Sequence, residues 1–246
     1  MASETEGARA RRKARRRSTG RRLFAFDRAL GVRWVAGADE AGRGSLAGPL
    51  VAAAVLFDLE SLTTRELRAL ARLNDSKQHS MEVREELFPI VLRTATKVSI
   101  VSRCARGIDA RGLHKTNLAA LRDALIGVAR PGCICLSDGF PVGDTGHEQR
   151  AVINGDATSA AIAAASIIAK VTRDRIMADH AVTYPGYGWE TNRGYPTPEH
   201  FRALDRLGLT PLHRRSFAPV RERLGAVPAV VVEFAGASLW SDTTRD

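Results

Sequence analysis

Apolar and polar positions follow two different periods along the chain. Residues 97–103 place Val98 and Ile100 two positions apart, which is typical of a β-strand. Residues 116–128 repeat apolar side chains at helical spacing, at Leu118, Leu121 and Leu125. On these grounds we expect strands at residues 34–38, 51–57, 97–103, 134–136 and 151–154. We expect helices at residues 61–72, 80–93, 116–128, 158–179, 199–207 and 219–224. This order of elements predicts an α/β domain that begins near residue 23.

Two stretches refine this picture. The predicted helix 158–179 is rich in alanine, and such small side chains would let it lie close against a sheet. From residue 184 glycines and prolines interrupt regular structure, while all three tyrosines and one tryptophan gather within residues 184–195. The pattern predicts a small C-terminal lobe from about residue 184. Residues 227–246 are weakly patterned and are expected to form a tail.

Charge is concentrated at the start of the chain. Residues 1–22 hold nine basic side chains and two glutamates, a net charge of +7, so only +3 of the total of +10 belongs to the other residues. We expect this leader to be disordered, because it has few apolar residues to bury. It is either an electrostatic arm for polyanions or a solvated extension without a binding role. No apolar stretch typical of a signal peptide follows its arginines.

Other features restrict the class of protein. No apolar run approaches the roughly 20 residues that span a bilayer, so we expect no membrane association. Three cysteines make a disulfide framework unfavourable and predict a reducing, cytoplasmic location. Cys133 and Cys135 alternate with apolar residues, which favours two buried thiols on one strand face over a metal site.

Carboxylates follow several of the predicted strands. Asp39 and Glu40 come directly after the apolar run 34–38 and are followed by a Gly-Arg-Gly loop at residues 42–44. Carboxylate oxygens suit Mg²⁺ or Mn²⁺, and glycines allow the backbone to approach a ligand closely. In a regular strand Asp39 and Glu40 would point to opposite faces unless the strand end twists. Asp138 follows the strand 134–136, where a simple turn is the alternative interpretation.

A further carboxylate comes from the start or the end of the long predicted helix. Asp156 precedes that helix and could alternatively be its N-cap. Asp174 lies 18 residues later, about 27 Å along a straight helix, so both cannot serve one metal centre. The arginines beside Asp174 favour ion pairing for it. Four carboxylates converging on a phosphate would supply a site for two divalent ions.

An ordered series of motifs resembles the bacterial ribonuclease HII family, the type 2 ribonucleases H. The motifs are AGADEAGRG at 36–44, LAGP at 46–49, DSK at 75–77, SDG at 137–139, GD at 155–156, IAAASIIAKV at 162–171, RD at 173–174, YGW at 187–189, NRGY at 192–195 and HRRSF at 213–217. Ser45 departs from the proline usual in the family. The resemblance implies a ribonuclease H-like fold over residues 23–226, with a central mixed sheet flanked by helices and a small helical C-terminal lobe.

The resemblance also implies a function. The implied function is that of a Mg²⁺- or Mn²⁺-dependent endonuclease, which would hydrolyse RNA in RNA–DNA hybrids and incise 5′ of single ribonucleotides in duplex DNA. The products would carry 3′-OH and 5′-phosphate ends, as in ribonucleotide removal from DNA. The family pattern assigns catalysis and two divalent ions to four carboxylates, Asp39, Glu40, Asp138 and Asp156.

Substrate contacts carry over from the same motifs. Gly42, Arg43 and Gly44 would sense the ribose 2′-OH, the group that distinguishes RNA from DNA, through their backbone. Tyr195 would stack on the deoxyribose after the ribonucleotide. Phosphate contacts would come from Lys77, Ser166 and Lys170, with solvated surface lysines as the alternative for the two lysines.

Structural roles are favoured for the other motif residues. His213 and the two arginines after it would fasten the lobe to the core, and Tyr187 and Trp189 would anchor the irregular loop. We expect a monomer, and the sequence does not decide whether a replication or repair clamp recruits it.

Two other functions stay open at this point. One is a nuclease of the same fold that acts on DNA branches or long hybrids without sensing a junction. The other is a non-catalytic nucleic-acid-binding protein whose basic leader is the functional part.

Overall fold

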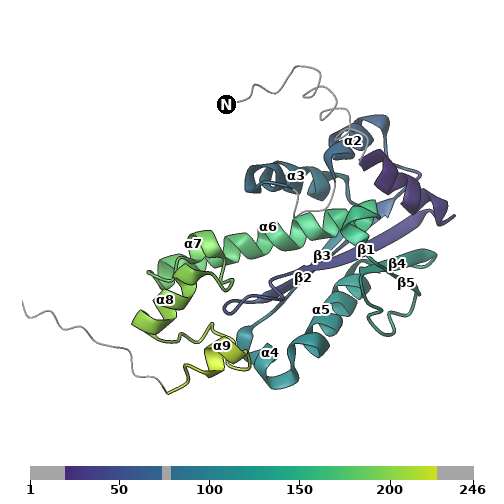
Figure 1. Cartoon of the computed structure of the whole chain (residues 1–246). Helices are drawn as coiled ribbons and strands as arrows, with labels where there is room; N and C mark the ends of the chain where they lie inside the picture. The colour runs from purple at the N-terminus through teal and green to yellow at the C-terminus, as the bar shows by residue number, and fades with distance from the viewer. Residues whose placement is uncertain (1–19, 74–78, 226–246) are drawn as a thin grey trace, which may run out of the picture.

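The computed structural model describes residues 20–73 and 79–225, which fold around one mixed sheet (Figure 1). The sheet has the strand order β3-β2-β1-β4-β5. Its strands are β1 (Trp34–Ala41), β2 (Leu50–Asp58), β3 (Lys97–Arg103), β4 (Cys133–Asp138) and β5 (Glu148–Val152). β1 and β3 are antiparallel to β2, whereas β4 is parallel to β1 and β5 is parallel to β4. The expected mixed sheet is confirmed.

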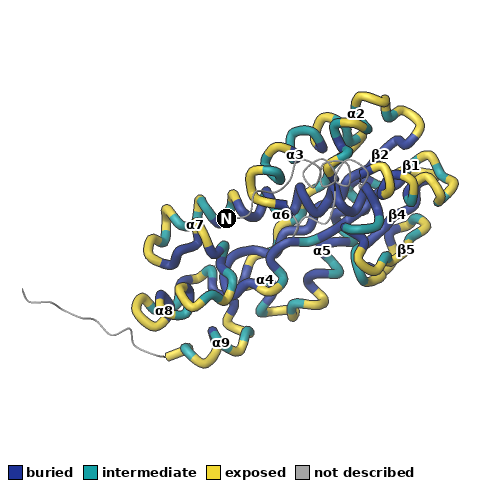
Figure 2. Tube along the Cα trace, turned by 45° about the horizontal axis from the view of Figure 1, so that its top comes forward, coloured by how far each residue is buried: buried dark blue, intermediate teal, exposed yellow. Residues whose placement is uncertain are grey.

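Helices cover both faces of this sheet (Figure 1). The long helix α6 (Ala160–Thr183) lies along one face over β1 and β2, with α3 (Met81–Thr94) packed against it, and α5 (Leu113–Val128) lies on the opposite face. The burial-coloured view shows the buried interior at the central strands β1, β2 and β4 and along α6, whereas the edge strands β3 and β5 are partly exposed (Figure 2). The sheet therefore separates two cores, one under α6 and one under α5.

The close fit of α6 on the sheet depends on small residues, as its alanine content predicts. A Cβ atom at Gly37 of β1 would lie 2.3 Å from the carbonyl carbon of Ala161. Asp27, from a helix at residues 20–29, accepts a hydrogen bond from the Ala161 amide at 3.0 Å. Because Gly37 has no side chain, the backbone of α6 can touch that of β1.

The remaining elements are short. They are α2 (Thr64–Ala69), η1 (Leu70–Arg72), α4 (Ala105–Arg111), η3 (Gly155–Ala157), α7 (Trp189–Asn192), α8 (Pro198–Leu207) and α9 (Ala218–Arg221). The helices α7, α8 and α9 form the predicted C-terminal lobe. Its core joins Trp189 and Tyr187 to Met177 of α6 and to Leu46 and Ala47 of the loop after β1. The anchoring role expected of Tyr187 and Trp189 is confirmed.

Several predicted bounds are wrong, for local reasons. The helix predicted from residue 61 begins at Thr64, because Thr63 and Glu66 form a capping box. The strand predicted at 151–154 ends at Val152, since Asn154 adopts a left-handed conformation with φ of 52°. α4 was not predicted because only two of its seven residues, Ala105 and Ile108, are buried.

The ends of the domain also differ from expectation. The first helix includes residues 20–22, which were assigned to the leader. The predictions for residues 1–19 and 227–246 lie outside the described residues. Within the described residues, no helix is both long and apolar enough to cross a membrane.

Candidate active site

The pairing of two parallel strands brings Asp39 and Asp138 together. β1 and β4 run side by side with Ala38 opposite Ser137, so the next residue on each strand is a carboxylate at the same end of the sheet. Asp39 and Glu40 lie inside β1, which is longer than predicted and ends at Ala41. The site thus begins on regular, hydrogen-bonded strands.

Asp39 and Glu40 point to opposite faces of the sheet, as the alternation of a strand requires. Asp39 is only 6% exposed, and its side chain is hydrogen-bonded to Ser166 on α6 and accepts the Glu40 amide at 2.7 Å. Glu40 is paired with Arg43 at 3.8 Å. Ser166 therefore touches a predicted metal-binding carboxylate, and its own contact with a substrate phosphate stays a prediction.

Asp138 and Asp156 are linked through a turn after β5. An Asp138 carboxylate oxygen accepts a hydrogen bond from the Gly155 amide at 2.7 Å, which holds η3 against the end of β4. Asp156 lies in η3 and is 5% exposed. The alternative that Asp156 caps the long helix is wrong, because Ser159 is the N-cap and accepts from the Ile162 amide.

The electrostatics of this end of the sheet are those of a buried anionic cluster. Burial raises the pKa of Asp39 well above its usual value, and the neighbouring charges of Glu40 and Asp138 raise it further. A hard divalent cation would relieve both effects, and carboxylate oxygens are its preferred ligands. The oxygen donors of these residues therefore suit such an ion.

The four carboxylates do not form a complete metal site in this conformation. Among the described residues, no group of three or more His, Cys, Asp and Glu side chains stands ready to hold a metal ion. The assignment of the four carboxylates to metal binding therefore stays a prediction.

Asp174 belongs to a separate polar cluster, and its predicted ion pairing is confirmed. It pairs with Lys170 at 3.3 Å and with Arg84 at 3.6 Å. Its neighbour Arg173 is buried and donates to the carbonyls of Ala47 and Pro49. Lys170 thus has a carboxylate partner, and its predicted phosphate contact is untested.

The Gly-Arg-Gly loop is held in place by two buried arginines. Gly42 has a φ of 88°, and a Cβ atom there would lie 1.9 Å from Nε of Arg173, so a side chain is excluded. Arg214 donates to the Arg43 carbonyl at 3.1 Å and to the Gly48 carbonyl through two nitrogens. The supporting role of Arg173 was not predicted, since its sequence neighbourhood resembles an exposed charged stretch.

Tyr195 lies half-buried between the long helix and the C-terminal lobe. The guanidinium carbon of Arg173 is 5.3 Å from the centre of its ring, and Nζ of Lys170 is 5.7 Å from it. Its carbonyl accepts a hydrogen bond from Nδ1 of His200 at 3.0 Å. Lys77, the remaining predicted contact, lies outside the described residues.

A chain of hydrogen bonds through the lobe fixes His200. Nε2 of His200 accepts from Trp189 at 3.1 Å and lies 3.2 Å from Nε2 of His213. Nδ1 of His213 accepts from the Thr210 amide at 2.9 Å. Both imidazoles are neutral in this arrangement, and burial lowers the pKa of His213 to about 4. The structural role expected for His213 is confirmed.

Comparison with known proteins identifies the class. The ribonuclease HII family profile matches residues 36–220. A ribonuclease HII of Nocardia farcinica is 49% identical over 82% of this chain and 78% of the relative, and one of Rhodococcus opacus is 45% identical over 86% and 92%. The crystal structure of ribonuclease H2 from Pyrococcus horikoshii superposes with a TM-score of 0.66 and 27% identity, covering 77% of this chain and 96% of that one.

The chain therefore belongs to the ribonuclease HII family. It is a type 2 ribonuclease H, an endonuclease that acts on the RNA of RNA–DNA hybrids. This membership excludes the alternative of a non-catalytic binding protein.

Proposed function

We propose that this enzyme incises duplex DNA on the 5′ side of a single embedded ribonucleotide, as a first step in ribonucleotide removal. The observation that carries the proposal is the juxtaposition of the buried Asp39–Asp138 strand ends with the Gly42–Gly44 loop, which the Arg214 guanidinium holds by the Arg43 carbonyl. A substrate phosphate at these carboxylates would have its ribose next to that loop, of which Gly44 is exposed.

Each residue then has a defined task. Asp39, Glu40, Asp138 and Asp156 would hold two divalent ions, Mg²⁺ or Mn²⁺, and Ser166 orients Asp39 by its hydrogen bond. When bound, such ions supply charge stabilisation and a usable nucleophile near neutral pH. The reaction is an in-line displacement at the phosphodiester that leaves 3′-OH and 5′-phosphate ends.

Discrimination of ribose from deoxyribose comes from the loop and the lobe. The backbone of residues 42–44 contacts the 2′-OH, and Tyr195 stacks on the sugar that follows, so a ribose-to-deoxyribose junction satisfies both. The partly exposed ring of Tyr195 and the rigid attachment of its backbone to His200 support this role. Lys170 would contact a substrate phosphate at the expense of its ion pair with Asp174.

The test is a parallel digestion of three substrates: an all-DNA duplex, the same duplex with one ribonucleotide, and a long RNA–DNA hybrid. We expect cutting of the last two in Mg²⁺ or Mn²⁺, none of the first, and none in EDTA. The end groups of the single-ribonucleotide product should be 3′-OH and 5′-phosphate. Efficient cutting of the hybrid without any incision at the single ribonucleotide would contradict the proposal and favour a nuclease that does not sense junctions.

A further inference from the structure

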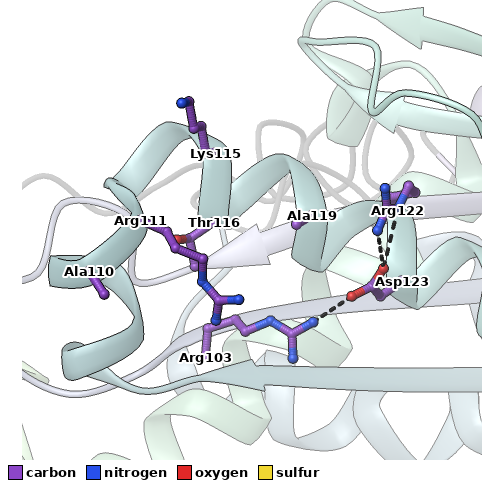
Figure 3. Close-up of a pocket in the computed structure, with 8 residues that line it drawn as sticks. All are labelled: Arg103, Ala110, Arg111, Lys115, Thr116, Ala119, Arg122 and Asp123. Atoms are coloured by element: carbon purple, nitrogen blue, oxygen red, sulfur yellow. Dashed lines mark hydrogen bonds and ion pairs between the residues drawn. The ribbon is translucent and has the colours of Figure 1, made fainter.

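A basic hollow of about 550 Å³ opens between β3, α4 and α5, apart from the four carboxylates (Figure 3). The side chains that matter for its chemistry come from all three elements. They are Arg103, Arg111, Lys115, Thr116, Arg122 and Asp123. The hollow is therefore built by tertiary packing and not by a single charged segment.

The charges in the basic hollow are unbalanced. The only carboxylate among its lining residues is Asp123, which pairs with both Arg103 and Arg122. In the described part of the chain, no ion pair joins Arg111 or Lys115 to an acidic group. Figure 3 shows the side chain of Arg111 extending toward that of Arg103, whose guanidinium is turned to Asp123. Like charges gathered in this way are stabilised by an anion between them.

A buried hydroxyl in the basic hollow also favours an anionic ligand. Thr116 lines the basic hollow, is only 2% exposed, and its Oγ1 has no hydrogen-bond partner within the described residues. A buried hydroxyl without a partner is destabilising, and a ligand oxygen that accepts its hydrogen bond would remove this cost. Thr116 is in the first turn of α5, where no side chain caps the amides and no acidic residue is present. That end of a helix favours negative charge.

The basic hollow lies at the same end of the sheet as the carboxylates. Arg103 ends β3 opposite Leu50, the first residue of β2, and Val51 is opposite Ala41 at the end of β1. Two strand spacings of about 4.8 Å separate β3 from β1, so the β3 side of the hollow, at Arg103, is on the order of 10 Å across the sheet from the strand that carries Asp39 and Glu40. That is about three base-pair steps of 3.4 Å along the axis of a duplex.

We propose that the basic hollow is a second phosphate-binding site, which holds a backbone phosphate of the bound duplex a few nucleotides from the cleaved bond. Arg111 and Lys115 supply the charge, Thr116 donates a directional hydrogen bond, and Asp123 holds Arg103 and Arg122 in place. The site adds affinity for any duplex substrate and does not depend on junction recognition. A long RNA–DNA hybrid therefore tests it independently of the function proposed above.

The primary test compares hybrid binding and cleavage by the wild type and the double variant Arg111→Ala/Lys115→Ala. We expect the Kd, measured by fluorescence anisotropy in EDTA, to rise about tenfold, which corresponds to one lost charge-assisted phosphate contact. The slope of log Kd against log salt should become shallower by about 1. In cleavage assays with Mg²⁺ the change should appear in KM and not in kcat.

Two further variants separate ligand binding from folding and from general charge. Thr116→Val keeps the volume of the side chain and removes only the hydroxyl, so it should weaken hybrid binding while leaving thermal stability equal or higher. Arg68→Ala, on α2 at the opposite end of the sheet, removes one exposed arginine and should leave Kd and the salt slope unchanged. An equal loss in Arg68→Ala would overturn the proposal.

Inorganic phosphate provides the last arm, because a free anion has the same chemistry as a backbone phosphate. If phosphate raises the Tm of the wild type but not of the double variant, while hybrid binding is the same in both, the site serves a free anion and the assignment to duplex is wrong. If hybrid binding and the response of Tm to phosphate are both the same in the wild type and the double variant, the proposed site does not exist. Loss of hybrid affinity in both the double variant and Thr116→Val supports it.

Discussion

The carboxylate end of the sheet and the C-terminal lobe (residues 184–225) both bury polar side chains, but with opposite results. At the carboxylate end, Asp39 is buried beside other negative charges, and its pKa is raised. In the lobe, His200 and His213 are buried as neutral groups, with each ring nitrogen in a hydrogen bond. The first arrangement is destabilising without a cation, and the second stabilises the fold.

The difference shows how the molecule divides its tasks. The lobe and the buried arginines hold the Gly-Arg-Gly loop and Tyr195 rigidly, through Arg214 and His200. The carboxylate end, on the most buried strands of the sheet, can then tolerate local repulsion because the surrounding core fixes the backbone. Substitutions at the carboxylate end should therefore lower activity more than stability, and substitutions at the lobe and the buried arginines should lower stability.

The largest effect is expected for Asp39→Asn. Loss of the charge should lower kcat on an RNA–DNA hybrid by about 100- to 1000-fold. The same change should leave the metal-free protein equally or more stable, because it relieves burial of charge and repulsion from Glu40 and Asp138. Single-turnover cleavage and urea unfolding in EDTA measure the two quantities.

Asp174→Asn is the matched control, since Asp174 is also 6% exposed but is paired with Lys170 and Arg84. It should cost about 1–3 kcal/mol of unfolding free energy and leave kcat nearly intact. If Asp39→Asn destabilised the metal-free protein as much as Asp174→Asn does, the contrast between paired and unpaired carboxylates would be wrong.

Arg214→Met tests whether the loop depends on the lobe. The substitution keeps an extended apolar side chain but removes the donors to the carbonyls of Arg43 and Gly48. We expect a loss of about 2–4 kcal/mol in unfolding free energy and a raised KM for the hybrid. Arg214→Lys should recover part of both, because an ammonium can still donate to one carbonyl. A KM equal to the wild-type value in Arg214→Met would show that substrate binding by the loop does not depend on Arg214.

The neutral histidines predict acid sensitivity. The pKa of His213 is about 4 in the folded protein and about 6.5 when unfolded, so the unfolded state binds more protons between these values. Stability should therefore be complete above about pH 6.5 and decline as the pH falls toward 4, with a loss of about 2 kcal/mol by pH 5. Urea titrations at pH 7, 6 and 5 measure it. The slope should flatten in His213→Asn and persist in His114→Asn, an exposed site; equal slopes in all three proteins would exclude His213 as the cause.

Tyr195→Ala should have the smallest effect on the fold and a moderate one on substrate choice. Loss of stacking on the sugar after the ribonucleotide should reduce incision at a single ribonucleotide by about tenfold relative to a long hybrid. Because the ring is partly exposed and its carbonyl bond to His200 persists, unfolding should change by less than about 1 kcal/mol. Tyr195→Phe, which keeps the ring, is the control. An unchanged ratio of the two cleavage rates in Tyr195→Ala would argue against stacking.

Much of the architecture could be predicted because local pattern and core burial agree. The strand 97–103 and the helices of α5 and α6 follow from the spacing of their apolar residues, and the family from the order of its motifs. α4 and the first helix could not be predicted with the same rules, since their stability comes from contacts with distant segments. One example is the bond from Asp27 to the start of α6.

The candidate site, too, was predicted only in part from the sequence. The residue types and their positions after strands already indicated a carboxylate centre for divalent ions. Only the tertiary structure decided that Ser166 binds Asp39, that Arg173 closes over Gly42, and that Arg103 of β3 lines one hollow with Arg111 of α4 and Thr116 of α5. These relations join different helices, strands and loops, and their distances depend on how helices pack on the sheet, which no local pattern records.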